Sequence, residues 1–425
     1  MTRPATAREP VLPAGLSTSV GGPAGARLLR PTRGPLAALA PVVLLLALPI
    51  SLAALRQAGC LTSGWKGGTP VWRQCASPLV QAVATGDLGR GLGAYLSGTV
   101  RVDLPVLEGG VTALLAGVAP GWGTGQQRWF LLLWTVLAAA LLAGLVVVVG
   151  TVRRHPASDP VALALSPVLA LTVLLSPDLL PVALAVVAVW AWSRGRAGLA
   201  GLLAGVALLG GALSGVVLLA MALVPSDAGG APDAGRAAVR RLLTATAATV
   251  ASLVVVVLLL DPAVLTRPYA AWLVAGAGPG SPWYLFTLVR HPVGATPVVV
   301  IAVLGWVLAA ALVVLMARRR PRPVVGAVAL VGLAAVLMTA PAFPPAAALW
   351  LVPFVALTGI RWRDHLLWAG AEALHAAALF GHLLERTDPA KGLPAGWYSV
   401  ALLLRLAAVG WVARQAWVAR THIDQ

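Results

Sequence analysis

The chain has 425 residues, of which 59% are hydrophobic and 11% are charged, against about 25% charged in an ordinary soluble domain. This composition excludes a soluble globular protein, and apolar runs of about 20 residues, the length of a helix across a bilayer, recur from Leu36 onward. The net charge of +17 does not indicate nucleic-acid binding, because the basic residues are mostly arginines in short loops between apolar runs. The sequence predicts an all-α polytopic membrane protein.

Residues 1–35 are rich in Pro, Gly, Thr and Arg and lack an apolar period, which predicts a disordered tail. Arginines directly before the first apolar run favour a cytoplasmic position for this tail. Residues 36–55 are too long an apolar run for a typical cleaved signal peptide and are expected to be a retained first helix. Residues 36–425 then form one transmembrane domain.

Residues 56–128 are the longest mixed segment of the chain and predict a large first outer loop. The pieces 77–97 and 104–119 are amphipathic and awkward as membrane spans, so we expect surface helices there. Cys60 and Cys75 suggest a disulfide if the loop faces an oxidising space, with two unrelated thiols as the alternative. No Cys/His spacing resembles a zinc or haem site.

Further apolar runs predict the remaining spans, and residues 261–297 form a second mixed loop. The run 198–224 is too long for one helix, and its glycines indicate a break near Ser214. The expected spans are 129–150, 161–175, 179–192, 198–224 in two parts, 242–260, 298–317, 324–339, 346–360, 365–384 and 397–417.

Groups of arginines between the spans indicate the orientation. If 104–119 lies along the surface, there are about 12 spans, both termini are cytoplasmic and the arginine groups all face the cytoplasm. If that piece crossed the membrane, most of the groups would lie outside, so the first arrangement is favoured. The groups occupy residues 153–154, 194–196, 236–241, 318–322, 361–363 and 414–420. This topology places 56–128, 176–178, Ser214, 261–297 and 340–345 on the outer face.

Several motifs in one order carry a resemblance to a known family. They are Cys60, residues 72–75, Leu-Pro-Val-Leu-Glu-Gly at 104–109, Asp-Leu-Leu-Pro-Val-Ala-Leu-Ala from Asp178, Ala-Trp-Ser-Arg-Gly-Arg at 191–196, Gly-Ser-Pro-Trp-Tyr at 280–284 and Leu-Trp-Leu-Val-Pro at 349–353. Over residues 36–420 the chain resembles the actinobacterial branch of glycosyltransferase family 87, in the GT-C superfamily.

The resemblance implies a GT-C-like helical bundle in a bacterial plasma membrane. Such enzymes take a sugar from a polyprenyl-phosphate donor and transfer it to a lipid or cell-envelope glycan. An outer-loop carboxylate then acts as general base, and basic and amide groups hold the donor phosphate. No metal or other cofactor is implied.

The chain departs from the family at its polar positions. The family's Cys-Tyr-Ser-Asp is Cys-Ala-Ser-Pro here, so Pro78 replaces the presumed catalytic Asp. Lys-Leu-Tyr-Pro becomes residues 212–215 without the lysine, and only Asp178 remains of Asn-Trp-Asp. The Asp before Gly-Ser-x-Trp-Tyr aligns with Gly278, and residues 339–346 replace the family's Thr-Asn-Lys-Val-Tyr-Ser-Pro-Gln. These losses favour a degenerate or strongly diverged transferase over a working one.

The remaining outer polar residues are candidates for a displaced site. Asp103, Glu108 and Asp178 are candidate bases, with solvated helix starts or a cap as the alternative. For a lipid phosphate the best outer candidates are Arg267 and Arg290. Two aromatic residues are either interfacial or stack on a sugar; they are Trp283 and Tyr284.

Glu372, His375 and Arg405 lie within predicted spans, where ionisable residues are expensive and usually paired. A structural contact between Glu372 and Arg405 is favoured over a substrate contact. Three functions follow from these candidates. The first is an impaired or working transferase homologue, the second a non-enzymatic protein that binds a lipid-linked glycan or scaffolds envelope-synthesis enzymes, and the third a transporter of such lipids.

Overall fold

The computed structural model describes residues 35–65, 69–85, 87–152, 159–224, 232–386, 388 and 390–419. The predicted disordered tail, apart from Pro35, lies outside the described residues, and so do Arg153, Arg154 and Arg420. All regular elements of the described residues are helices. The predicted helical fold class is therefore confirmed.

Five helical segments are long and apolar enough to cross a membrane: Leu39–Ser63, Gly123–Thr151, Asp233–Leu260, Ala295–Ala317 and Ala395–Val418. Each has at least 23 residues, and a helix rises about 1.5 Å per residue, so each exceeds the hydrocarbon core of about 30 Å. Only 17% to 39% of the most apolar stretch of each helix is buried inside the protein. Such exposed apolar faces suit contact with lipid.

The helices follow one another without long excursions, and their bounds are as follows. The first part of the chain forms α2 (Pro35–Leu45), α3 (Ala47–Ser63), α4 (Thr69–Trp72), α5 (Pro78–Thr85), η1 (Leu88–Arg90), α6 (Leu92–Leu96), α7 (Val106–Val118), α8 (Gly123–Thr151), α9 (Pro160–Ala164) and α10 (Pro167–Thr172). The middle part forms α11 (Leu179–Ser193), α12 (Ala197–Leu208), α13 (Ser214–Leu223), α14 (Pro232–Leu260), α15 (Ala263–Val274) and α16 (Tyr284–Leu288). The last part forms α17 (Ala295–Ala317), α18 (Val325–Thr339), η2 (Pro345–Trp350), α19 (Val352–Thr358), α20 (Trp362–Glu385) and α21 (Ala395–Val418).

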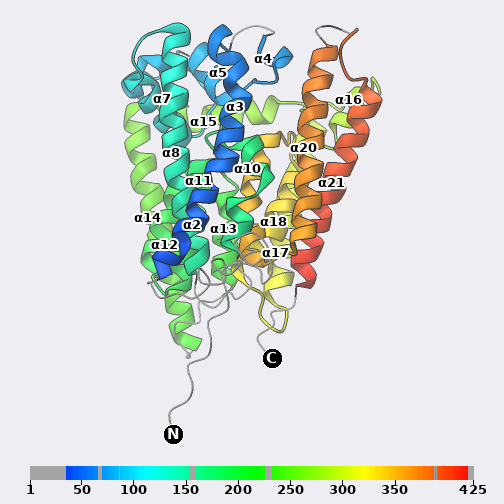
Figure 1. Ribbon diagram of the computed structural model, residues 1–425. Coiled ribbons are helices and arrows are strands. Elements are labelled where there is room, and N and C mark those ends of the chain that lie inside the picture. The colour runs from blue at the N-terminus through cyan, green and yellow to red at the C-terminus, as the bar shows by residue number, and fades with distance from the viewer. Residues whose placement is uncertain are drawn as a thin grey trace.

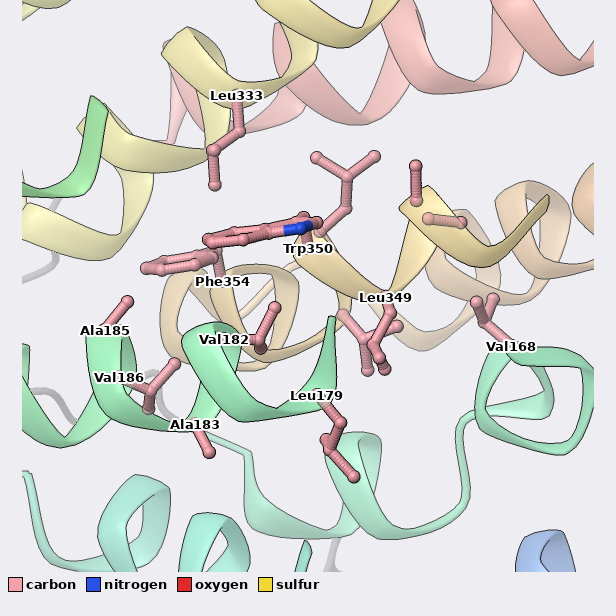
Figure 2. Packing of buried hydrophobic residues seen from close by; sticks show 14 of the residues in the cluster. Val168, Leu179, Val182, Ala183, Ala185, Val186, Leu333, Leu349, Trp350 and Phe354 are labelled. Carbon is pink, nitrogen blue, oxygen red and sulfur yellow. The ribbon is translucent and has the colours of Figure 1, made fainter. Parts of the chain in front are cut away.

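Shorter apolar helices fill the centre of the bundle. Nearly every side chain of α11, α18 and α19 is buried, as expected of helices that are hydrophobic all round. Figure 2 shows Trp350 and Phe354 packed between Leu333 of α18 and Val182 of α11. This centre holds the ends of α11 and η2, which carry polar residues, in fixed positions.

The helical bundle has two distinct ends (Figure 1). The short helices α4, α5, α7 and α16 gather at one end, which we call the loop end, whereas α2 begins and α21 finishes at the other, the terminal end. Helix α7, with 13 residues, is too short to cross a bilayer of about 30 Å. The amphipathic pieces 77–97 and 104–119 thus form short helices.

Backbone hydrogen bonds join the loop-end segments to one another. Leu79 N donates to Leu175 O (3.1 Å) and Leu107 N donates to Leu209 O (3.1 Å). Gly278 N donates to Pro341 O over 2.8 Å. The segments expected on the outer face therefore lie together.

Several helix boundaries differ from the sequence prediction. The expected span 161–175 divides into α9 and α10, 346–360 divides into η2 and α19, and α14 begins at Pro232 rather than at 242. Helix α3 continues past Arg56 to Ser63, and α8 begins at Gly123, so the first loop is shorter than residues 56–128. Arg56 and Gln57 remain helical because both have partners in folded segments: Arg56 Nη1 donates to Leu171 O (2.8 Å) and Gln57 Oε1 accepts from Trp65 Nε1 (3.0 Å). The break near Ser214 is present, since α13 begins there.

Candidate functional site

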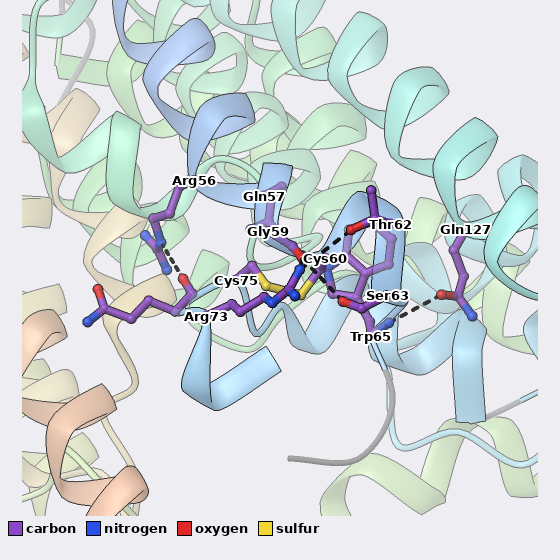
Figure 3. Close-up of a disulfide and its surroundings, with 11 residues drawn as sticks. Arg56, Gln57, Gly59, Cys60, Thr62, Ser63, Trp65, Arg73, Cys75 and Gln127 are labelled. Atoms are coloured by element: carbon purple, nitrogen blue, oxygen red, sulfur yellow. Dashed lines mark hydrogen bonds between the residues drawn. A yellow bond between two sulfur atoms is a disulfide. The ribbon is translucent and has the colours of Figure 1, made fainter. Parts of the chain in front are cut away.

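A disulfide fixes the start of the first loop (Figure 3). It joins Cys60 in α3 to Cys75, with Cα atoms 5.9 Å apart, and both cysteines are fully buried. Arg73 Nη1 donates to Gly59 O over 2.8 Å beside the bridge. The disulfide therefore fixes the position from which the next segment begins.

That next segment contains the position where the resemblance expects a catalytic Asp. Pro78 begins α5, and the buried Ser77 donates through Oγ to Leu174 O (2.7 Å) and accepts from Val80 N (3.4 Å). Together with the bond from Leu79 N to Leu175 O, these contacts dock the segment onto the chain just before Asp178. This position therefore holds an anchored helix start and no carboxylate.

Two of the three candidate carboxylates lie together at this place. Glu108, in the first turn of α7, is only 3% exposed, and its carboxyl interacts with that of the partly exposed Asp178, directly before α11. Burial raises the pKa of Glu108 well above its usual 4.5, and the negative charge of Asp178 raises it further. Both effects favour the protonated form of Glu108 beside Asp178.

Asp178 has further partners that favour its ionised form. Burial raises the pKa of the Asp178 carboxyl, while hydrogen bonds with Glu108, Ser176 and Trp350 oppose that rise. Its side chain does not cap α11. Two carboxyl groups that share one proton in this way divide the roles of acid and base between them.

Unpartnered polar atoms lie beside the pair. Oε1 of Glu108 and Oγ1 of Thr112 are buried without a hydrogen-bond partner in the described part of the chain. The two residues are four positions apart and so share one face of α7. Because buried polar atoms nearly always have a partner, this face of α7 is suited to a polar ligand group.

Tyr95 closes the other side of α7. Its hydroxyl donates to Leu104 O (3.3 Å), and a Cβ at Gly109 would collide with that hydroxyl, so only glycine fits there. Burial raises the pKa of Tyr95 to about 12. The charge of Arg267 acts to lower this pKa, and Glu108 acts to raise it. Tyr95 thus stays protonated near both Glu108 and Arg267.

The two candidate phosphate-binding arginines differ in their surroundings. Arg267 Nη2 lies 2.7 Å from Asp261 Oδ2, so its charge is already compensated. Arg290 is exposed, at a positive φ of 63°. Within the described ranges no interaction joins Arg290 to the carboxyl pair. Asp103 is exposed and lies outside the pair.

The intramembrane polar residues form a separate network. Arg405 Nε lies 2.8 Å from Glu372 Oε2, and both side chains are almost fully buried. The same guanidinium donates to the carbonyls of Phe343 and Pro344, and Trp368 Nε1 donates to Glu372 Oε1 (3.1 Å). Arg405 therefore holds the 343–344 turn in place, which is a structural role.

Aromatic residues extend this network to the second loop. The Tyr398 hydroxyl accepts from Gly280 N (3.0 Å) and lies 3.3 Å from His375 Nε2, and its ring stacks on that of His382 at 4.9 Å. Tyr284 Oη lies 3.4 Å from His382 Nε2, whereas Trp283 Nε1 donates to Thr339 O (3.2 Å). Both predicted aromatics thus fasten the loop rather than face solvent.

Sequence reasoning named Glu108 and Asp178 separately and missed the residues around them. Trp350, Ser176 and Thr112 occur in otherwise apolar segments, and the only available signal was a polar atom in each side chain. No group of His, Cys, Asp or Glu in the described residues could hold a metal ion. The sequence matches no protein-family model, and no curated protein matches it.

Proposed function

We propose that the chain is an integral membrane glycosyltransferase homologue with a GT-C-like helical bundle. Its donor is a polyprenyl-phosphate sugar and its acceptor a lipid or cell-envelope glycan. The observation that carries the proposal is the buried pair of Glu108 and Asp178, which stands beside the segment where a base is otherwise missing. The resemblance in chain order supports the same reaction class.

The pair supplies the proton chemistry of such a transfer. The acceptor hydroxyl attacks the anomeric carbon of the donor sugar, the bond from that carbon to the phosphate oxygen breaks, and polyprenyl phosphate leaves. Asp178, whose hydrogen bonds with Glu108, Ser176 and Trp350 favour its carboxylate form, takes the hydroxyl proton, as a general base must. Glu108 keeps its own proton and orients Asp178 by donating to it.

For the membrane arrangement we infer about 12 crossing segments with both termini in the cytoplasm, in the plasma membrane of a bacterium. The loop end then faces outward, where an oxidising environment suits the bond between Cys60 and Cys75. The arginine groups at 194–196, 236–241, 318–322 and 361–363 then face inward.

Cysteine labelling in intact cells tests this orientation. A cysteine placed at the exposed Asp103 should react with a membrane-impermeant maleimide, whereas one placed at the exposed Arg361 should react only after the cells are opened. The reverse labelling pattern would contradict the orientation.

The pairing of Arg267 with Asp261 favours a second candidate function. A positive group commonly stabilises the leaving phosphate in such a transfer, and Arg267, which lies near Tyr95, is already compensated by Asp261. A protein that binds a lipid-linked glycan without transferring it, or that scaffolds envelope-synthesis enzymes, needs no such group.

One experiment separates the two candidates. The purified full chain is incubated with labelled polyprenyl-phosphate hexoses and pentoses together with an envelope lipid extract, and both bound donor and transferred label are measured. Transfer of label supports the enzyme. Saturable donor binding without transfer of any sugar would establish the binding function and reject the enzyme.

A further inference from the structure

The connection between α17 and α18 carries three exposed arginines: Arg318, Arg320 and Arg322. The guanidinium groups of Arg318, Arg320 and Arg322 are exposed and have no hydrogen-bond or ion-pair partner among the described residues. Arg319 differs, because it donates to Trp417 O and lies over the Trp417 ring at 5.2 Å. Among the described residues, three neighbouring cations thus have no partner that would compete with an anion.

A cavity of about 260 Å³ lies against these arginines. Its lining combines the three arginines with apolar residues, which are Leu223, Val224, Ala317 and Pro323. The volume lies below the range of about 300–1,000 Å³ typical of small-molecule sites. It therefore suits a compact charged group rather than a whole lipid.

The cavity lies at the depth where lipid headgroups are found. Helix α17 is a membrane-spanning candidate of 23 residues that ends at Ala317, and at about 1.5 Å per residue it covers the hydrocarbon core of about 30 Å. Arg318 is the first residue beyond that core. On α17 itself, Leu308 and Leu315 are 49% and 56% exposed, so an apolar surface leads from the cavity into the bilayer.

We propose that this cavity binds the phosphate-bearing headgroup of one anionic membrane lipid. The three arginines would bind the phosphate oxygens, for which guanidinium groups have a matching geometry. Leu223 and Val224 would contact the adjoining glycerol and first acyl carbons. Basic pockets between membrane helices are known to take such headgroups. The site is independent of the carboxyl pair and of sugar transfer.

The alternative explanation is that the arginines at the terminal end only set the orientation of the protein in the membrane. The arginines of α14 provide the comparison: Arg236, Arg240 and Arg241 are exposed at the same end, but they lie along a helix surface, and Arg236 lies 3.7 Å from Asp233. The cavity and its apolar wall distinguish the α17–α18 connection from that group. A matched pair of triple variants can therefore separate charge from site.

The experiment measures lipid binding by native mass spectrometry of the full chain in a neutral maltoside detergent. Short-chain phosphatidylglycerol should bind one molecule saturably, and phosphatidylcholine should not. Arg318→Gln/Arg320→Gln/Arg322→Gln should weaken binding by about fivefold for each arginine removed. Arg236→Gln/Arg240→Gln/Arg241→Gln removes the same charge and should bind as the unchanged protein does.

Other outcomes would overturn the proposal. An equal loss in both triple variants would mean unspecific attraction, and equal binding of phosphatidylcholine would mean a purely apolar groove. Displacement of phosphatidylglycerol by equimolar inorganic phosphate would mean a site for the free anion. Ala317→Phe keeps the three charges but fills the cavity, so unchanged lipid binding in this variant would place the lipid elsewhere.

Discussion

Glu108 in α7 and Asp178 before α11 place their carboxyl groups against one another in the buried loop end of the bundle. Neither helix brings them together alone. Helix α7 is docked by the bond from Leu107 N to Leu209 O (3.1 Å), and α11 is held in the central core. The pair is therefore a product of tertiary packing.

Stability should fall as the pH rises above the usual Glu108 pKa of 4.5. Above this pH the unfolded chain loses the Glu108 proton while the folded protein keeps it, so unfolding releases a proton. The raised pKa of Asp178 acts in the same direction. Thermal unfolding of the purified protein between about pH 5 and about pH 8 measures the effect. Glu108→Gln keeps the donor without the titration and should flatten the curve.

Asp103→Asn is the control for this pH dependence, because Asp103 is exposed and lies outside the pair. It should keep the slope of the unchanged protein. If Glu108→Gln showed that slope as well, Glu108 would not be the protonated member of the pair.

Arg405→Ala should lower the free energy of unfolding by about 3–5 kcal/mol, because it leaves Glu372 charged and buried. The carbonyls of Phe343 and Pro344 would also lose their donor. Removing Glu372 as well should recover part of the loss. Arg414→Ala, an exposed position on the same helix, is the control in thermal unfolding. Equal unfolding temperatures of the two arginine variants would refute the structural role.

Gly280→Ala should destabilise the protein by more than about 1 kcal/mol, since an L-residue disfavours the left-handed region. Gly280 has a φ of 84°, and a Cβ there would collide with the Phe343 carbonyl. Gly276→Ala is the matched control, because nothing lies within 4 Å of its Cβ position. A Gly280→Ala protein that unfolds at the same temperature as Gly276→Ala would show that the loop contact is not tight.

Replacing both Cys60 and Cys75 by serine should cost about 3 kcal/mol of stability on the chain-entropy model for a loop of this length, the sequence separation being 15. A reducing agent should lower the unfolding temperature of the unchanged protein towards that of the double variant. It should leave the double variant itself unaffected. An unfolding temperature that neither the double substitution nor the reducing agent lowers would show that the disulfide does not stabilise the protein.

Local patterns in the sequence predict much of the fold. Long apolar runs predict the crossing helices, and the glycines before Ser214 predict the break between α12 and α13. The pattern fails at Arg56, where a charged residue suggests a helix end but its distant partner, Leu171 O, keeps the helix intact. Partners far along the chain cannot be inferred from periodicity.

The candidate site shows the same limit. The sequence pattern predicts that a carboxylate near a helix start is solvated or caps the helix. Asp103 is indeed exposed, but Glu108 is buried and Asp178 does not cap α11. What distinguishes the latter two is their contact with one another, and that depends on how α7 docks. The Glu372–Arg405 contact was accessible to reasoning because charges inside a membrane span need a partner.

The most direct test of the proposed function compares transfer rates of Asp178→Asn and Asp103→Asn. With a donor that the unchanged protein uses, Asp178→Asn should slow transfer by about 10²–10⁴-fold, as expected for the loss of a general base. Donor binding should be retained, and Asp103→Asn should transfer at the unchanged rate. Transfer by Asp178→Asn at the full rate would contradict the role of the carboxyl pair in sugar transfer.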